Sequence, residues 1–157
     1  MLRLLELIDK PIKGNYDFKH LQSIHRYIFQ DIYEWAGEVR KVDIAKGNMF
    51  CNVRFIDSQA DEIFGKLKQD RYLEGLQENE IIKKLAYYFS EINALHPFRE
   101  GNGRSQREFI RSLAIRNGYI ISFADIPQEE MTKASQDSFL CEYEAMEELF
   151  KHCVRKK

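Results

Sequence analysis

Apolar residues recur every three or four positions along most of the 157-residue chain, as in amphipathic helices packed around one core. The first such stretch follows Asp17, a residue type that caps helices, and ends before Gly37. Others begin near residues 57, 79, 103 and 127, and a last one runs from Met146 to Cys153. The expected inward-facing residues are Leu21, Ile24, Ile28, Phe29 and Ile32; Ala60, Ile63, Phe64 and Leu67; Ile82, Leu85, Phe89 and Ile92; Phe109, Ile110, Leu113 and Ala114; Met131, Ala134, Ser138 and Phe139; and Met146, Leu149, Phe150 and Cys153. The pattern predicts a mainly α protein forming a single domain over residues 1–157.

Charge and cysteine usage narrow the class of protein. Lys and Arg number 24 against 25 Asp and Glu, and this balance disfavours a general nucleic-acid binder or a membrane span. The apolar start of the chain is interrupted by Arg3 and Glu6, which favours an amphipathic helix over a signal peptide. Cys51, Cys141 and Cys153 have neither disulfide-framework nor C-x-x-C spacing. We therefore expect a cytoplasmic protein with no nucleic acid and no membrane as partner.

One segment departs from the helical period. Between about residues 40 and 57 apolar residues alternate with polar ones, around Val42 and Ile44 and again from Cys51 to Phe55. Lys46-Gly47-Asn48 between them has the composition of a turn, so the segment predicts a β-hairpin. The exposed edges of a two-stranded ribbon can pair with another chain. A purely structural decoration is the alternative.

The run HPFREGNGRSQR, residues 96–107, is where chemistry is expected. The residue before a proline avoids the α conformation, so the preceding helix should end near Leu95. The next helix should begin by about Gly103. Two glycines around Asn102 let backbone N–H groups converge at that helix N-terminus, which is an anion site by geometry and by dipole. Neither the Walker pattern nor the dinucleotide-binding glycine pattern fits this loop.

Three arginines follow on one helix face. Arg104, Arg107 and Arg111 stand at i, i+3 and i+7, where like charges repel. Glu108 can neutralise one of them, whereas a polyphosphate could engage several.

His96 and Glu100 flank the same loop. A single carboxylate beside phosphates suits Mg²⁺, which completes its shell with phosphate oxygens and water. A histidine there suits a general base for an incoming hydroxyl. No Cys/His cluster indicates zinc. Core or surface positions are expected for His20, His25 and His152.

The run at 96–107 resembles the active-site motif of the Fic family, H-P-F-x-[D/E]-G-N-G-R-x-x-R. Residues 11–17, 20–25, 31–38, 114–123 and 134–150 also resemble family segments, so the likeness extends over about residues 11–150. It implies a Fic-type helical bundle with a small β-hairpin flap at about 40–57. Most family members of this pattern are protein adenylyltransferases, which move AMP from Mg²⁺-ATP to a Ser, Thr or Tyr hydroxyl of a target protein.

The resemblance also implies roles for individual residues. His96 would be the catalytic base, Glu100 would hold Mg²⁺, and Phe98 would anchor the loop. The nucleotide-binding residues would be Gly101, Asn102, Gly103, Arg104 and Arg107. The target protein would dock on the flap.

Alternatives remain beside this interpretation. Doc-like phosphotransferase toxins carry a lysine where this chain has Gly103, which favours nucleotidyl transfer here. Another nucleotide, phosphate or phosphocholine as the donor, and a non-catalytic nucleotide-binding module, are the other readings. A toxin acting at home and an enzyme delivered into another cell both stay open.

Many Fic proteins carry an inhibitory helix with the pattern [S/T]-x-x-x-E-[G/N]. Two partial matches occur here, Ser58 to Glu62 and Ser138 to Glu142, and each lacks the final Gly or Asn. We therefore expect restraint by a separate inhibitory, antitoxin-like protein or by a terminal segment.

Overall fold

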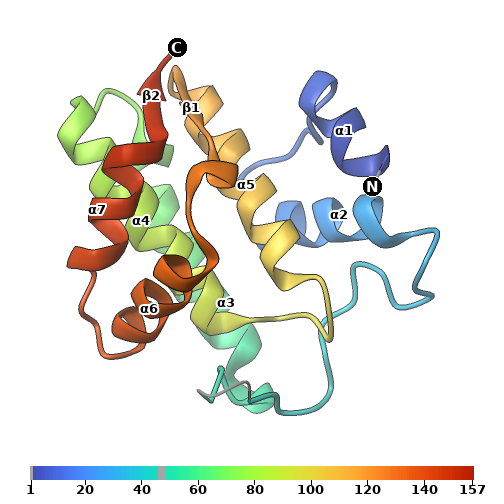
Figure 1. Ribbon diagram of the computed structural model, residues 1–157. Helices are drawn as coiled ribbons and strands as arrows, with labels where there is room; N and C mark the ends of the chain where they lie inside the picture. The colour runs from blue at the N-terminus through green and yellow to red at the C-terminus, as the bar shows by residue number, and fades with distance from the viewer. Residues whose placement is uncertain (1, 46–48) are drawn as a thin grey trace.

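The computed structural model describes residues 2–45 and 49–157 of the chain. Within these residues most of the chain is helical, with one pair of short strands (Figure 1). The α-helices are α1 (Leu2–Asp9), α2 (Phe18–Phe29), α3 (Ile56–Gln69), α4 (Glu78–Leu95), α5 (Asn102–Arg116), α6 (Gln128–Phe139) and α7 (Glu144–Cys153). The strands are β1 (Tyr119–Ile121) and β2 (Val154–Lys156). The mainly α fold expected from the apolar periodicity is confirmed.

Helix α2 shows how local signals set the elements. The Asp17 carboxylate accepts the His20 N–H at 2.9 Å and so caps the helix as expected. The expectation that Ile32 faces inward is wrong, because its side chain is 57% exposed. The helix ends at Phe29, whose carbonyl accepts the N–H groups of Ile32 and Tyr33 in a turn. Ile32 therefore lies beyond the helix, and its side chain does not continue the buried face of α2.

The core is organised around α4 and α5. Helix α4 packs against α3, α5, α6 and α7, and α5 also packs against α2. In Figure 1, α5 runs between α2 on one side and α4, α6 and α7 on the other. Phe89 of α4, Phe109 of α5 and Phe150 of α7 are all buried. The loop at 96–101 joins these two central helices, so both of its ends are held by the core.

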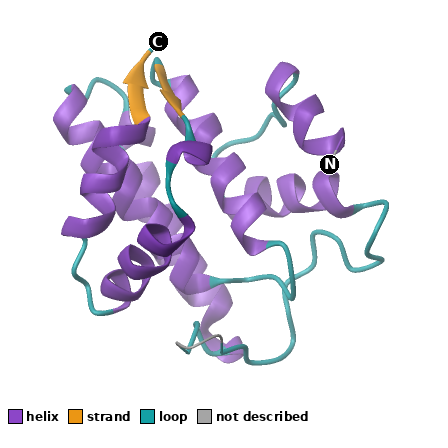
Figure 2. Ribbon diagram, viewed as in Figure 1, coloured by secondary structure: helices purple, strands orange, loops and turns teal. Residues whose placement is uncertain are grey.

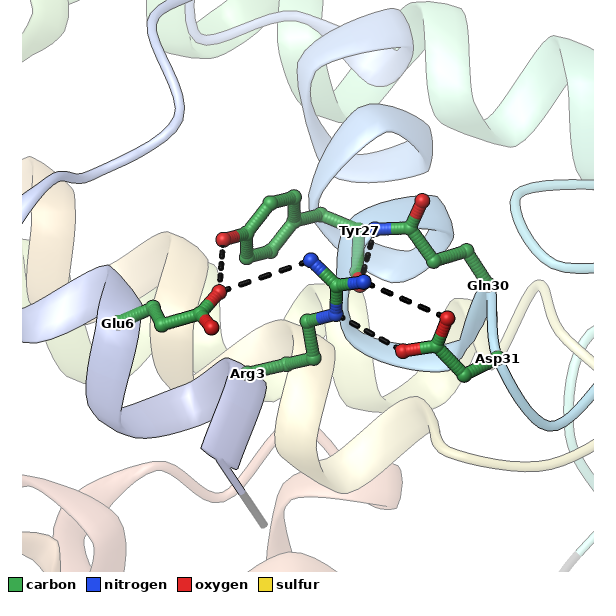
Figure 3. Close-up of polar contacts among 5 residues, drawn as sticks. All are labelled: Arg3, Glu6, Tyr27, Gln30 and Asp31. Atoms are coloured by element: carbon green, nitrogen blue, oxygen red, sulfur yellow. Dashed lines mark hydrogen bonds and ion pairs between the residues drawn. The ribbon is translucent and has the colours of Figure 1, made fainter.

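Helix α1 rests on α2 through polar contacts (Figure 3). The Arg3 guanidinium donates to both carboxylate oxygens of Asp31, at 2.9 and 3.3 Å. Tyr27 donates its hydroxyl proton to Glu6, and Glu6 lies 3.6 Å from Arg3. Exposed ion pairs of this kind contribute little stability, about 0–1 kcal/mol each.

The segment at 40–57, called the flap segment below, is less regular than expected. It turns back at a single antiparallel bridge, Ala45 with Met49, and the Phe50 N–H donates to the Ile44 carbonyl. The expected strand at 53–55 is wrong: these residues form a 3₁₀ turn that leads into α3. The expected turn at 46–48 lies outside the described residues.

Two side-chain contacts explain the 3₁₀ turn. The Asp43 carboxylate accepts the Val53 N–H at 2.8 Å, and the Asn52 side chain accepts the Arg54 N–H at 2.9 Å. The backbone is thereby capped rather than paired with a strand.

The regular strand pair lies elsewhere. Strand β1 pairs antiparallel with β2, with Ile120 opposite Arg155. Figure 2 shows this pair beside the C-terminus, at the other end of the molecule from the flap segment. The pattern of apolar residues did not predict it, because each strand has only three residues. None of the helices within 2–45 and 49–157 has the length and apolar character needed to cross a membrane.

Candidate active site

The loop between α4 and α5 begins at His96. Its backbone is left-handed (φ 45°, ψ 61°), and its N–H donates to the Ile92 carbonyl, which ends α4 at Leu95 as predicted. The chain then turns through buried Pro97 and re-enters a helix at Asn102. The loop thus places a histidine at the C-terminus of one core helix, a few residues before the N-terminus of the next.

A hydrogen bond and a ring contact orient the imidazole of His96. Its Nδ1 lies 3.2 Å from the carbonyl oxygen of Asn93. Because a carbonyl oxygen only accepts hydrogen bonds, this contact requires a proton on Nδ1, so the neutral ring carries its lone pair on Nε2. The ring also stacks on buried Phe50 of the flap segment, with centroids 3.7 Å apart and planes at 8°. His96 therefore has the tautomer and the fixed ring that a general base at Nε2 needs.

Asn102 holds the loop closed. Its side-chain oxygen accepts the Phe98 N–H at 2.9 Å, and its side-chain nitrogen donates to the Phe98 carbonyl at 2.7 Å. The residue is 5% exposed, and Phe98 is fully buried. Because both ends of this side-chain amide are bonded to Phe98, only the backbone N–H of Asn102 is left to contact a phosphate.

Gly101 is the N-cap of α5, and its φ of +81° is one that side chains rarely adopt. A Cβ atom at Gly101 would lie 2.3 Å from the ring of Phe29, which is 1% exposed and has no room to move. A Cβ at Gly103 would lie 3.2 Å from the Arg107 guanidinium. The glycines thus let Phe29 and Arg107 approach the backbone at the α5 N-terminus closely.

Glu108 pairs with Arg111, the last of the three arginines. Both of its carboxylate oxygens accept from Arg111 at 2.8 Å, and Arg111 also donates to a backbone carbonyl of α1. The sequence predicted that Glu108 can neutralise one of the three arginines, and in the structure that arginine is Arg111. Within residues 2–45 and 49–157, Arg107 forms no ion pair with a carboxylate. Desolvation and then the like charge of Arg104 lower the pKa of Arg107. An anion beside Arg104 and Arg107 would relieve that repulsion.

Glu100 is exposed at the tip of the loop, and its backbone is fixed by His25. The His25 Nδ1 accepts the Gly37 N–H at 2.9 Å, so Nε2 carries the proton and donates to the Glu100 carbonyl at 2.8 Å. The His25 ring is fully buried and stacks on Phe98 at 3.9 Å, and burial lowers its pKa. The sequence predicted a core or surface position for His25, and the structure shows a core position. Its support of the loop was missed, because nothing near His25 in the sequence indicates a partner 75 residues away.

Glu100 is the carboxylate that this loop offers to a cation. Within the described part of the chain, no three His, Cys, Asp or Glu side chains cluster as a metal site. The Glu100 carboxylate forms no ion pair with another described residue. A lone carboxylate next to an anion site suits Mg²⁺, which is usually bound together with phosphate oxygens.

Comparison with known proteins places this site in a family. The family model described as Fic/DOC family matches residues 15–114, which include the loop. The protein adenylyltransferase VbhT of Bartonella schoenbuchensis is 45% identical over 139 residues, covering 88% of this chain and 29% of VbhT. The probable protein adenylyltransferase Fic of Escherichia coli is 39% identical over 136 residues, covering 86% of this chain and 68% of that protein. The chain thus spans less than a third of the first relative and about two thirds of the second.

A solved structure shows the same fold. The N-terminal Fic domain of a putative cell filamentation protein from Bartonella quintana, solved with bound ADP, superposes with a TM-score of 0.92 at 28% identity. The match covers 99% of this chain and 81% of that one. With the family model matching most of the chain and the active-site run intact, this protein belongs to the Fic/DOC family.

Proposed function

We propose that this protein is a protein adenylyltransferase, which transfers AMP from Mg²⁺-ATP to a hydroxyl side chain of a target protein. The names of the relatives and the nucleotide in the Bartonella quintana structure support this class of reaction. The observation that carries the proposal is the contact of His96 Nδ1 with the Asn93 carbonyl, which assigns the ring proton to Nδ1, in a loop that leads into the N-terminus of α5.

The reaction assigns each group a task. His96 Nε2 takes the proton from the target hydroxyl, and the hydroxyl oxygen attacks the α-phosphorus of ATP. The bond between the α-phosphorus and the oxygen that bridges to the β-phosphate breaks, so pyrophosphate leaves and AMP stays on the target. The Nδ1–H bond to Asn93 keeps the ring oriented while Nε2 carries the proton.

The phosphates would lie against the α5 N-terminus. Backbone N–H groups at Gly101 to Gly103 and the cations of Arg104 and Arg107 supply the positive field there. Glu100 would hold Mg²⁺, which neutralises charge on the α- and β-phosphates when bound. Gly103 leaves the position open where Doc-like phosphotransferases carry lysine, which favours nucleotidyl over phosphoryl transfer.

The target protein would dock along the flap segment. Phe50 of this segment stacks on His96, so a strand laid against the flap segment would bring its hydroxyl close to the base. A groove of about 280 Å³ lies beside it, lined by apolar side chains that include Met49, Phe55 and Phe139.

Labelled ATP tests the proposal. The purified chain is incubated with Mg²⁺ and ATP labelled at either the α- or the γ-phosphate, alone for automodification and with a cell extract as a source of targets. Transfer of the α-label only, and none by His96→Ala, is the expected result. Transfer of the γ-label would mean phosphorylation. Tight ATP binding without any transfer would mean a non-catalytic module, and either outcome would overturn the proposal.

Control by an internal glutamate is not expected. Neither Glu62 nor Glu142 forms an ion pair with Arg107, and both side chains are exposed. We propose that restraint comes from a separate inhibitory protein or from a terminal segment, so the 157-residue chain should modify itself without activation. A severalfold rise in automodification by Glu62→Gly or Glu142→Gly would show that the inhibitor is intramolecular.

A further inference from the structure

We infer that Arg40 is a positioning residue, which ties the flap segment to the active-site loop and so fixes His96 relative to the docked target. The inference rests on the proposed base role of His96. The sequence assigned Arg40 no role other than to begin the expected hairpin. In the fold it is 2% exposed and lies between the two parts of the site.

The Arg40 side chain donates to backbone carbonyls on both sides. On the loop side, its Nε donates to the His96 oxygen at 2.7 Å and its Nη2 to the Leu95 oxygen at 3.3 Å. On the flap side, Nη1 donates to the Val42 oxygen at 2.7 Å and Nη2 to the Cys51 oxygen at 2.5 Å. The planar guanidinium, with its five donors in a fixed fork, can hold four such acceptors at once, and a lysine ammonium cannot.

The charge of Arg40 is offset mainly by backbone carbonyls, with a coulombic contribution from Asp43. Among the residues that the structure describes, Arg40 forms no ion pair, and burial lowers its pKa. Its acceptors include Leu95, the last residue of α4, and His96, which caps it. The C-terminal end of a helix dipole is negative, so this is a favourable place for a buried cation. A cation kept here at the cost of desolvation is better explained by the connection it makes than by stability.

A network follows from these contacts. Besides the Leu95 oxygen held by Arg40, the Ala94 oxygen accepts the Cys51 N–H at 3.0 Å. The Arg40 N–H donates to the Pro97 oxygen at 2.9 Å. The end of α4, the left-handed His96 and the flap segment are thus joined at several points. Loss of the guanidinium would release the flap segment and His96 together, while the arginines that face the phosphates stay in place.

Arg40→Lys tests the inference, with Arg116→Lys as the matched control. Arg116 pairs with Glu74 at the far end of α5, and within the described residues it forms no hydrogen bond with the loop or the flap segment. For Arg40→Lys we expect single-turnover automodification at saturating ATP to fall about tenfold or more. Calorimetric affinity for ATP should stay within about threefold of the parent. For Arg116→Lys we expect both to stay at the parental values.

Amide hydrogen exchange separates this inference from the proposed function. In Arg40→Lys the Cys51 amide should exchange about tenfold faster, while the Leu113 amide in the core of α5 keeps its parental rate. An unchanged Cys51 rate, or a loss of ATP affinity that matches the loss of transfer, would overturn the inference. If the parent transfers no label at all, the proposed function fails, and the exchange rates still decide the role of Arg40.

If Arg40→Lys does not fold, the parent chain itself supplies the test. The Arg40 Nε–H should be protected from exchange as strongly as core amides, because it is buried and bonded to the His96 carbonyl. A rapidly exchanging Nε–H would overturn the inference.

Discussion

Replacing Gly101 with alanine should destabilise the protein more than the same change at Gly118 or Gly65. Two effects add at this position. Its φ of +81° costs a residue with a Cβ atom about 1–2 kcal/mol. The new Cβ would also lie 2.3–2.4 Å from the Phe29 ring, and overpacking of a well-packed core costs about 1–3 kcal/mol. We expect a loss of about 2–5 kcal/mol in the free energy of unfolding.

Alanine substitutions at two other glycines separate the backbone strain from the clash of the new Cβ atom. Gly118 also has a positive φ, +85°, but a Cβ there meets nothing within 4 Å, so Gly118→Ala should cost only the backbone strain of about 1–2 kcal/mol. Gly65 lies inside α3 with open space around it, so Gly65→Ala should stabilise the protein by about 0.5–1 kcal/mol.

Urea unfolding at constant pH measures the three variants, provided that the slope with denaturant is unchanged. A loss for Gly101→Ala no larger than that for Gly118→Ala would refute the clash with Phe29. If Gly101→Ala does not fold, the second change Phe29→Leu provides the check, because it opens space at the ring. Failure of that change to restore folding would equally contradict the packing argument.

Three further predictions concern the site and its surroundings. His96→Ala should lower transfer by about 10²–10⁴-fold in a labelled-ATP assay and leave ATP binding largely intact, and equal turnover would remove the base assignment. Arg104→Ala should weaken ATP binding by about 1.5–3 kcal/mol in calorimetry, since it removes a charge-assisted contact, and an unchanged affinity would return Arg104 to a solvated helix face. Burial lowers the pKa of both His20 and His25, so below pH about 6.5 the unfolded chain binds more protons than the folded one. Stability should therefore fall as the pH drops from 7 to 5.5, by up to about 1.4 kcal/mol per pH unit for each histidine, and a flat urea profile would contradict this.

Much of the fold can be predicted from local sequence patterns. The period of apolar residues gave the bodies of α2 to α7, because one buried face per helix leaves a repeat that needs no knowledge of the partner. Pro97 and the glycines around Asn102 fixed the loop between α4 and α5, because they restrict or free the backbone at their own positions. The run at 96–107 and its likeness to the Fic family led to the family that the comparisons then showed.

The tertiary structure decided which polar groups meet. Side chains form hydrogen bonds with residues far away in the sequence. Arg40 bonds to His96, 56 residues away, and His25 bonds to Glu100, 75 residues away. A local sequence pattern does not show which residues far apart in the chain will form such hydrogen bonds. These groups meet, and are shielded from water, only once the surrounding helices have packed. The same holds for the flap segment, where side-chain caps from Asp43 and Asn52 replaced the strand that alternating residues predicted. The sequence thus predicted which loop should carry the chemistry, and the contacts that hold this loop in place arise only from the packed fold.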